Sequence, residues 1–132
     1  MDQYFERISF PFTISELFHG FAQAHGIFRV EEDAVVLEYV VQDGFLGAIK
    51  SSVRTLRIPY GQIESLTMRK GWWRRSIVLR TATMDAPTSI PGNATGEIRL
   101  SIKREDKPKA QEAISRLSLR MSEERLKKIE NW

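Results

Sequence analysis

The hydrophobic residues of this chain change their spacing near residue 106, and this change constrains the fold more than any other feature. Over residues 97–103 they alternate, so that Ile98, Leu100 and Ile102 share one face of an expected β-strand. From Asp106 onward they recur at every third or fourth position, as in a helix with one apolar face: Ala110, Ala113, Ile114, Leu117 and Met121. The chain therefore predicts strands followed by one helix that starts after Asp106 and ends near Asn131.

Earlier segments also alternate between apolar and polar residues. We expect five upstream strands, at 26–30, 35–42, 53–58, 63–69 and 76–83. The second of them places four apolar side chains on one face: Val35, Leu37, Tyr39 and Val41. The two prolines and the glycine of 87–93 predict a loop with at most an edge strand. A second helix after a break at Ser122 is the alternative to one long helix. With 132 residues, the chain has the length of one domain.

The segment between the last two of these strands combines aromatic and basic residues. It consists of Met68-Arg69-Lys70-Gly71-Trp72-Trp73-Arg74-Arg75, so the two tryptophans follow a glycine and two bases lie on either side. We expect a hairpin here, because Gly71 permits a tight turn. Alternation along the strand would point one tryptophan ring inward and the other outward. Two interpretations stay open: the outward ring contacts a partner, or one ring folds back over the sheet and the other is exposed by chance.

Charge is distributed unevenly along the chain, although the net charge is only +3. Residues 1–43 carry a net charge of −6, residues 44–80 a net charge of +7, and residues 81–132 a net charge of +2. Either these charges pair within the fold, or the middle third forms a basic face that attracts acidic partners.

Several classes of function find no support in the residue pattern. The chain has no cysteine, which excludes disulfides and thiolate metal sites. His19 and His25 have no third ligand at a suitable spacing, so we expect no metal site and no cofactor. No serine lies in a nucleophile-elbow pattern and no glycine-rich phosphate loop is present, so we expect no catalytic residues and no enzymatic activity. Without a signal peptide or a membrane-spanning apolar run, the expected location is cytoplasmic.

The order of strands and helix resembles the pleckstrin-homology-like superfold, in particular its bacterial PH and GRAM-type members. The resemblance also rests on four local features: the basic hairpin and the segments Ile58-Pro59-Tyr60-Gly61-Gln62-Ile63, Ile90-Pro91-Gly92 and Lys103-Arg104-Glu105-Asp106. The resemblance implies a mainly β (α+β) fold, with a curved sheet or partial barrel of about seven strands and a long C-terminal helix over one open end. It also implies a binding module and not an enzyme.

The resemblance sets the expected domain boundaries. We expect the PH-like domain at 26–121, an N-terminal extension at 1–25 and a C-terminal helix extension at 122–132. In the N-terminal extension, Ile8–Ile14 is a candidate extra strand and Ser15 a candidate helix cap. Phosphoinositide-binding members carry basic residues in their first hairpin loop, whereas we expect this loop to be the acidic segment 31–33. We therefore do not expect headgroup binding of that kind.

The leading hypothesis is a non-catalytic interaction module for a protein partner. Its expected contact residues are those of the hairpin, Arg69, Lys70, Trp72, Trp73, Arg74 and Arg75, followed by Phe45 and Leu46 in a second apolar tip. The alternative is peripheral association with an anionic membrane, to which each base contributes ~1 kcal/mol. Nucleic acid is weakly supported, because the first third of the chain is acidic. The repeat of Leu126, Ile129 and Trp132 predicts packing on the N-terminal residues or on a second copy, which would give a homodimer.

Overall fold

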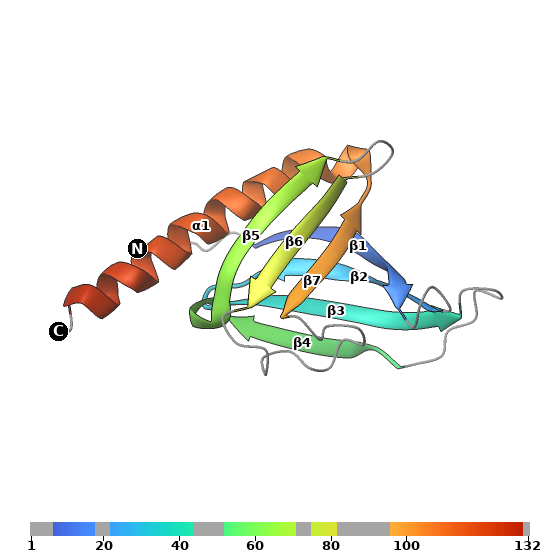
Figure 1. Cartoon of the computed structure of the whole chain (residues 1–132), viewed down its shortest axis with the longest axis horizontal. Helices are drawn as coiled ribbons and strands as arrows, with labels where there is room; N and C mark the ends of the chain where they lie inside the picture. Colours follow the sequence, from blue (N-terminus) through green and yellow to red (C-terminus); the bar gives the residue numbers. More distant parts are fainter. Residues whose placement is uncertain (1–6, 18–21, 44–51, 71–74, 82–95, 131–132) are drawn as a thin grey trace.

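The computed structural model describes residues 7–17, 22–43, 52–70, 75–81 and 96–130. Within these ranges seven antiparallel strands form one sheet, in the spatial order β4-β3-β2-β1-β7-β6-β5 (Figure 1). The strands are β1 (Ile8–Leu17), β2 (Ala22–Val30), β3 (Ala34–Asp43), β4 (Arg54–Pro59), β5 (Ile63–Lys70), β6 (Arg75–Thr81) and β7 (Glu97–Ile102). Two short 3₁₀ helices, η2 (Tyr60–Gln62) and η3 (Arg104–Asp106), precede β5 and the helix α1 (Lys107–Glu130). The predicted mainly β, α+β class with a C-terminal helix is confirmed.

The sheet bends back on itself, because β5, β6 and β7 cross steeply over β1 to β4 (Figure 1). The two groups of strands meet where β1 lies beside β7, and the ladder there holds a single residue pair, Thr13 with Ser101. The two edges of the sheet are β4 and β5, which follow each other along the chain through η2. The described residues therefore form a strongly curved, open sheet with a core on its inner side.

Alternate residues of each strand face this core, as the pleat of a strand requires. Phe10 of β1 and Phe28 of β2 stack in it, with ring centroids 4.7 Å apart. Leu37 of β3 and Leu100 of β7 belong to the same cluster and are completely buried. The predicted inward faces of the segments 35–42 and 97–103 are thus confirmed.

The helix α1 covers the core with its predicted apolar face. Its buried residues are Ala110, Ala113, Leu117 and Met121, and the half-buried Ile114 packs against them. It contacts β1, η2 and β5, so it bridges the two groups of strands. The alternative of a break at Ser122 is wrong, because the helix continues and the Ser122 hydroxyl donates a hydrogen bond to the Ser118 carbonyl at 3.0 Å. Among the described residues, no helix is both long and apolar enough to cross a membrane.

The N-terminal part of the chain differs from the prediction. The candidate extra strand is β1, and a β-bulge after Ile14 carries it on to Leu17, so the helix expected to start at Ser15 is wrong. The sheet thus begins at Ile8, inside the segment that the resemblance left out. Because β2 starts at Ala22 and pairs with β1, the acidic segment 31–33 is the second hairpin loop and not the first. The first loop lies outside the described residues and contains no lysine or arginine: Phe18-His19-Gly20-Phe21.

Candidate functional site

The predicted basic hairpin is confirmed for its two strands. β5 and β6 pair antiparallel up to Lys70, which lies opposite Arg75, while Arg69 lies opposite Ser76. Arg69 and Lys70 are exposed. The other predicted site residues lie outside the described part of the chain: Trp72, Trp73 and Arg74 at the hairpin tip, and Phe45 and Leu46 in the second apolar tip.

The start of α1 brings further cations to the same end of the molecule. β6 pairs with β7, so that Arg75 lies opposite Ile102, and the chain then continues through Arg104 to Lys107. The pKa of Lys107 is lowered, chiefly by the positive charge of Arg75, then by partial loss of hydration and by the charges of Lys70 and Arg104. The strand pairing brings these four residues to one end of the molecule, because Lys70 lies opposite Arg75 and the chain leads from Ile102 to Arg104 and Lys107.

We call this cluster and its two basic sequence neighbours the basic end: Arg69, Lys70, Arg75, Lys103, Arg104 and Lys107. Within the described residues, none of these six side chains takes part in an ion pair or a hydrogen bond. Two carboxylates, Glu105 and Asp106, lie in the same segment but pair with none of them. The basic end therefore carries a surplus of positive charge that the described residues leave uncompensated.

Arg75 differs from the other members of the basic end. It has the same parity along β6 as Ile77 and Leu79, so its side chain starts on the core-facing side of the sheet. It is half-buried, and its Nη1 atom is shielded from solvent without a hydrogen-bond partner. A buried charged donor without a partner is costly, so an acceptor from a ligand would lower the free energy of this site.

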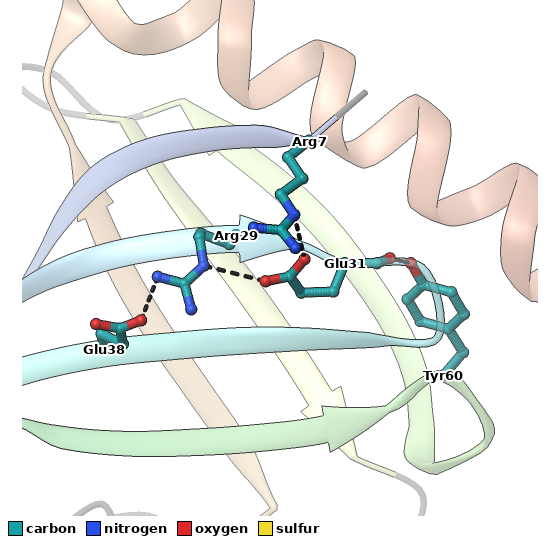
Figure 2. A network of polar contacts seen from close by, with 5 residues as sticks. All are labelled: Arg7, Arg29, Glu31, Glu38 and Tyr60. Atoms are coloured by element: carbon teal, nitrogen blue, oxygen red, sulfur yellow. Dashed lines mark hydrogen bonds and ion pairs between the residues drawn. The ribbon is translucent and has the colours of Figure 1, made fainter. Parts of the chain in front are cut away.

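Acidic residues of the first third of the chain form ion pairs with bases that lie outside the basic end (Figure 2). Glu31 pairs with Arg7 at 3.1 Å and with Arg29 at 3.3 Å, and Arg29 also pairs with Glu38. The hydrogen bond to Glu38 is the main reason why the pKa of Arg29 is raised. The hydroxyl of Tyr60 donates a hydrogen bond to the Glu31 carbonyl oxygen, and burial raises the pKa of Tyr60 to about 12. The contact of Tyr60 with Glu31 thus holds the acidic turn, residues 31–33, against η2.

The acidic turn lies far from the basic end. The turn and η2 lie at the start of β5 and the basic end at its far end, as Figure 1 shows for η2 and the start of α1. Eight residues of strand span about 23 Å at ~3.3 Å per residue, more than twice the screening length of ~8–10 Å at physiological salt. The interpretation that charges pair within the fold thus holds for Glu31 and Glu38, and not for the basic end.

Arg104 and Lys107 were not among the predicted site residues. The sequence shows the basic residues of this segment, but it does not show that they lie beside the hairpin. That follows from the pairing of β6 with β7, which a local pattern cannot predict across the long connection from 82 to 96. The predicted lack of a metal site was based on His19, which lies outside the described residues, and on His25. In the part of the chain that is described, no three histidine or acidic side chains lie together as a metal would require.

No protein-family model matches this chain, and the comparisons with curated proteins and with solved structures found no match either. The arrangement of seven antiparallel strands and a C-terminal helix is compatible with a PH-like fold.

Proposed function

We propose that this protein is a PH-like, GRAM-type interaction module that binds an acidic segment of a protein partner through its basic end. The uncompensated charge of the basic end is the observation that supports this proposal most directly. Like charges held together raise the free energy of the unbound protein, as the lowered pKa of Lys107 reflects. Carboxylates of a partner would relieve this repulsion and would steer the encounter.

The strength of such binding depends on more than the cations. An exposed ion pair contributes only ~0.2–1 kcal/mol, so the basic end alone would give weak, salt-sensitive binding. In protein interfaces, a few buried aromatic and arginine side chains supply most of the affinity. The sequence places Trp72 and Trp73 between Lys70 and Arg75, and we propose them as the anchors of the contact.

A charge-reversal experiment tests this function. Replacing Arg69, Lys70 and Lys107 by glutamate reverses exposed or half-exposed charges, and a glutamate at the first residue of α1 also suits the helix dipole, so the fold should persist. Arg75 is left unchanged, since its buried end makes reversal a risk to folding. The matched control reverses three exposed bases that lie elsewhere and have no ion pair among the described residues: Arg54, Arg125 and Lys128.

The readout is binding of a fluorescent decapeptide of aspartate and glutamate, followed by co-purification of partners from the native cell. We expect wild type and the control variant to bind the peptide, more weakly as salt rises to physiological strength, and the basic-end variant to lose binding. Equal binding by both variants would overturn the proposal. Binding to phosphatidylserine vesicles without binding to the peptide or to a co-purified protein would favour the membrane alternative instead.

A further inference from the structure

A cleft of about 570 Å³ lies beside the junction of β1 and β7, and the half-buried lining residues Thr13, Gln23, His25 and Ser101 alternate with core residues, so that they face away from the core. Among the described residues, the ladder that joins these two strands pairs Thr13 with Ser101. The cleft takes its lining from β1, β2 and the segment that leads from β7 into η3: Pro11, Phe12, Thr13, Gln23, His25, Gly26, Ser101, Ile102, Lys103 and Arg104.

The lining has the chemistry of a site for an amphiphilic anion. Two cations, Lys103 and Arg104, lie at one side, and the lining residues that the structure describes include no carboxylate. Hydroxyl groups of Thr13 and Ser101 add hydrogen-bond donors on adjacent strands. Pro11, which is exposed, contributes an apolar surface. A few polar groups converging on a partly apolar hollow of roughly 300–1,000 Å³ are typical of small-molecule sites in proteins.

We propose that this cleft binds a small organic anion, a carboxylate or a phosphate monoester carried on an apolar body. The anionic group lies against Lys103 and Arg104 and accepts hydrogen bonds from the hydroxyls of Thr13 and Ser101. The apolar body covers Pro11. This goes beyond the proposed function, because the cleft is built mainly from β1, β2 and β7 and shares only Lys103 and Arg104 with the basic end.

Titration of the ¹⁵N-labelled protein with four probes tests the site by amide chemical shifts. Benzoate and phenyl phosphate carry the proposed anion on an apolar ring, inorganic phosphate lacks the ring, and benzylammonium reverses the charge. We expect benzoate and phenyl phosphate to shift the amides of Thr13, His25 and Ser101 in a saturable manner. Inorganic phosphate should bind at least tenfold more weakly, and benzylammonium should cause no saturable shift.

Two variants locate the binding. Ser101→Phe should fill the cleft and weaken phenyl phosphate binding at least tenfold, while the acidic peptide still binds the basic end. Should that variant not fold, Lys103→Gln with Arg104→Gln should also weaken phenyl phosphate binding at least tenfold, and both side chains are exposed. Because both residues also belong to the basic end, this variant should weaken binding of the acidic peptide as well. Lys70→Glu is the control, since Lys70 does not line the cleft, and it should leave phenyl phosphate binding unchanged.

The proposal is overturned if benzylammonium binds as well as benzoate. It is also overturned if the anions shift the amides of Lys70 and Lys107 and leave those of Thr13 and Ser101 in place. That second result would assign the anions to the basic end. A wild-type protein that binds phenyl phosphate but not the acidic peptide would contradict the proposed function alone, so the two proposals fail separately.

Discussion

At the scale of single residues, Gly26 shows how closely three strands approach one another. It lies in β2 between Phe12 of β1 and Tyr39 of β3. A Cβ atom at this position would lie 2.1 Å from the Glu38 carbonyl oxygen, 2.7 Å from the Tyr39 Cβ and 2.9 Å from the Phe12 ring. Two of these neighbours belong to the backbone or to the base of a side chain, so they cannot turn away.

We therefore expect Gly26→Ala to destabilise the protein by about 1–3 kcal/mol or more, because β2 and β3 must separate to admit the methyl group. Gly61→Ala in η2 is the matched control, since no atom lies within 4 Å of the position its Cβ would take. The urea midpoints of both variants check this expectation. Equal midpoints would mean that the strands at Gly26 adapt without cost.

Tyr60 provides a residue-scale prediction that depends on pH. Its buried hydroxyl donates to the Glu31 carbonyl, and its pKa is raised from 10.0 to about 12. The folded state therefore holds this proton more tightly than the unfolded state. The resulting stabilisation is complete below pH 10 and is lost as the pH rises from 10 to about 12. A shift of this size corresponds to roughly 2–3 kcal/mol.

Tyr60→Phe should cost ~1 kcal/mol at neutral pH, because it removes the hydrogen bond. Above pH 10 the wild type should lose stability faster than the variant, by roughly 2–3 kcal/mol at pH 12. Urea unfolding of both proteins at several pH values measures this difference in stability. The other titrating groups are the same in the two proteins, so their contributions cancel. Parallel curves would show that the Tyr60 proton is not linked to folding.

At the scale of elements, β7 has one face in the core and one in solvent. Leu100 is completely buried in the cluster that also holds Leu117, whereas Arg99 is exposed and pairs with Glu97 at 3.5 Å. Leu100→Asp would bury a carboxylate without a partner and should cost several kcal/mol, enough to threaten folding. Arg99→Asp should cost less than ~1 kcal/mol. Thermal melting separates the two outcomes, and similar losses would contradict the assignment of the faces.

The helix α1 carries a second apolar stripe opposite its buried face. Leu119, Leu126 and Ile129 are 61%, 58% and 66% exposed. Successive residues of a helix turn by about 100°, which places Leu119 and Leu126 roughly half a turn from Leu117, and Ile129 about a third of a turn from it. Beyond Ser122 the described residues of α1 are exposed, apart from the half-buried Glu124. Packing of this segment on the N-terminal residues or on a second copy stays a prediction.

Truncation after Ser122 tests this prediction at the level of the whole helix. If a second copy covers the stripe, the molar mass measured by light scattering should fall from dimer to monomer. If the N-terminal residues cover it, the mass should stay constant and the melting temperature should fall. Leu126→Gln with Ile129→Gln should reproduce either result, while Lys127→Gln with Lys128→Gln should not. No change in mass or melting temperature would mean that the tail is solvated.

At the scale of the whole molecule, the alternation of apolar and polar residues is sufficient to predict most strands and the faces that they turn to the core. Val35 to Val41 and Ile98 to Ile102 show this clearly, because burial on one side leaves a period of two in the sequence. What alternation could not show is which strands are neighbours. The joining of β1 to β7 and the meeting of Lys70 with Lys107 depend on contacts between distant segments, for which a local pattern holds no information.

The same limit explains the misplaced acidic loop. The resemblance starts at Gly26 and therefore predicts 31–33 as the first hairpin loop, while the irregularity between Ile14 and Leu17 interrupts the pattern of the true first strand. The uncompensated charge could not be predicted either. The sequence showed that acids and bases lie in different thirds of the chain, and only the fold shows that Glu31 pairs with Arg7 and Arg29 while Lys70 lies at the opposite end of β5.

The single pair between Thr13 and Ser101 has a consequence for the order in which the molecule can assemble on the ribosome. The hairpins of β1 to β4 can form while the chain is still emerging. β1 must wait for β7, which is synthesised roughly 4 to 18 s later at typical rates of about 5–20 residues per second. Until then the rings of Phe10 and Phe28 lack both β7 and the helix that completes their core. The nascent first half is thus the state of this protein most in need of a chaperone.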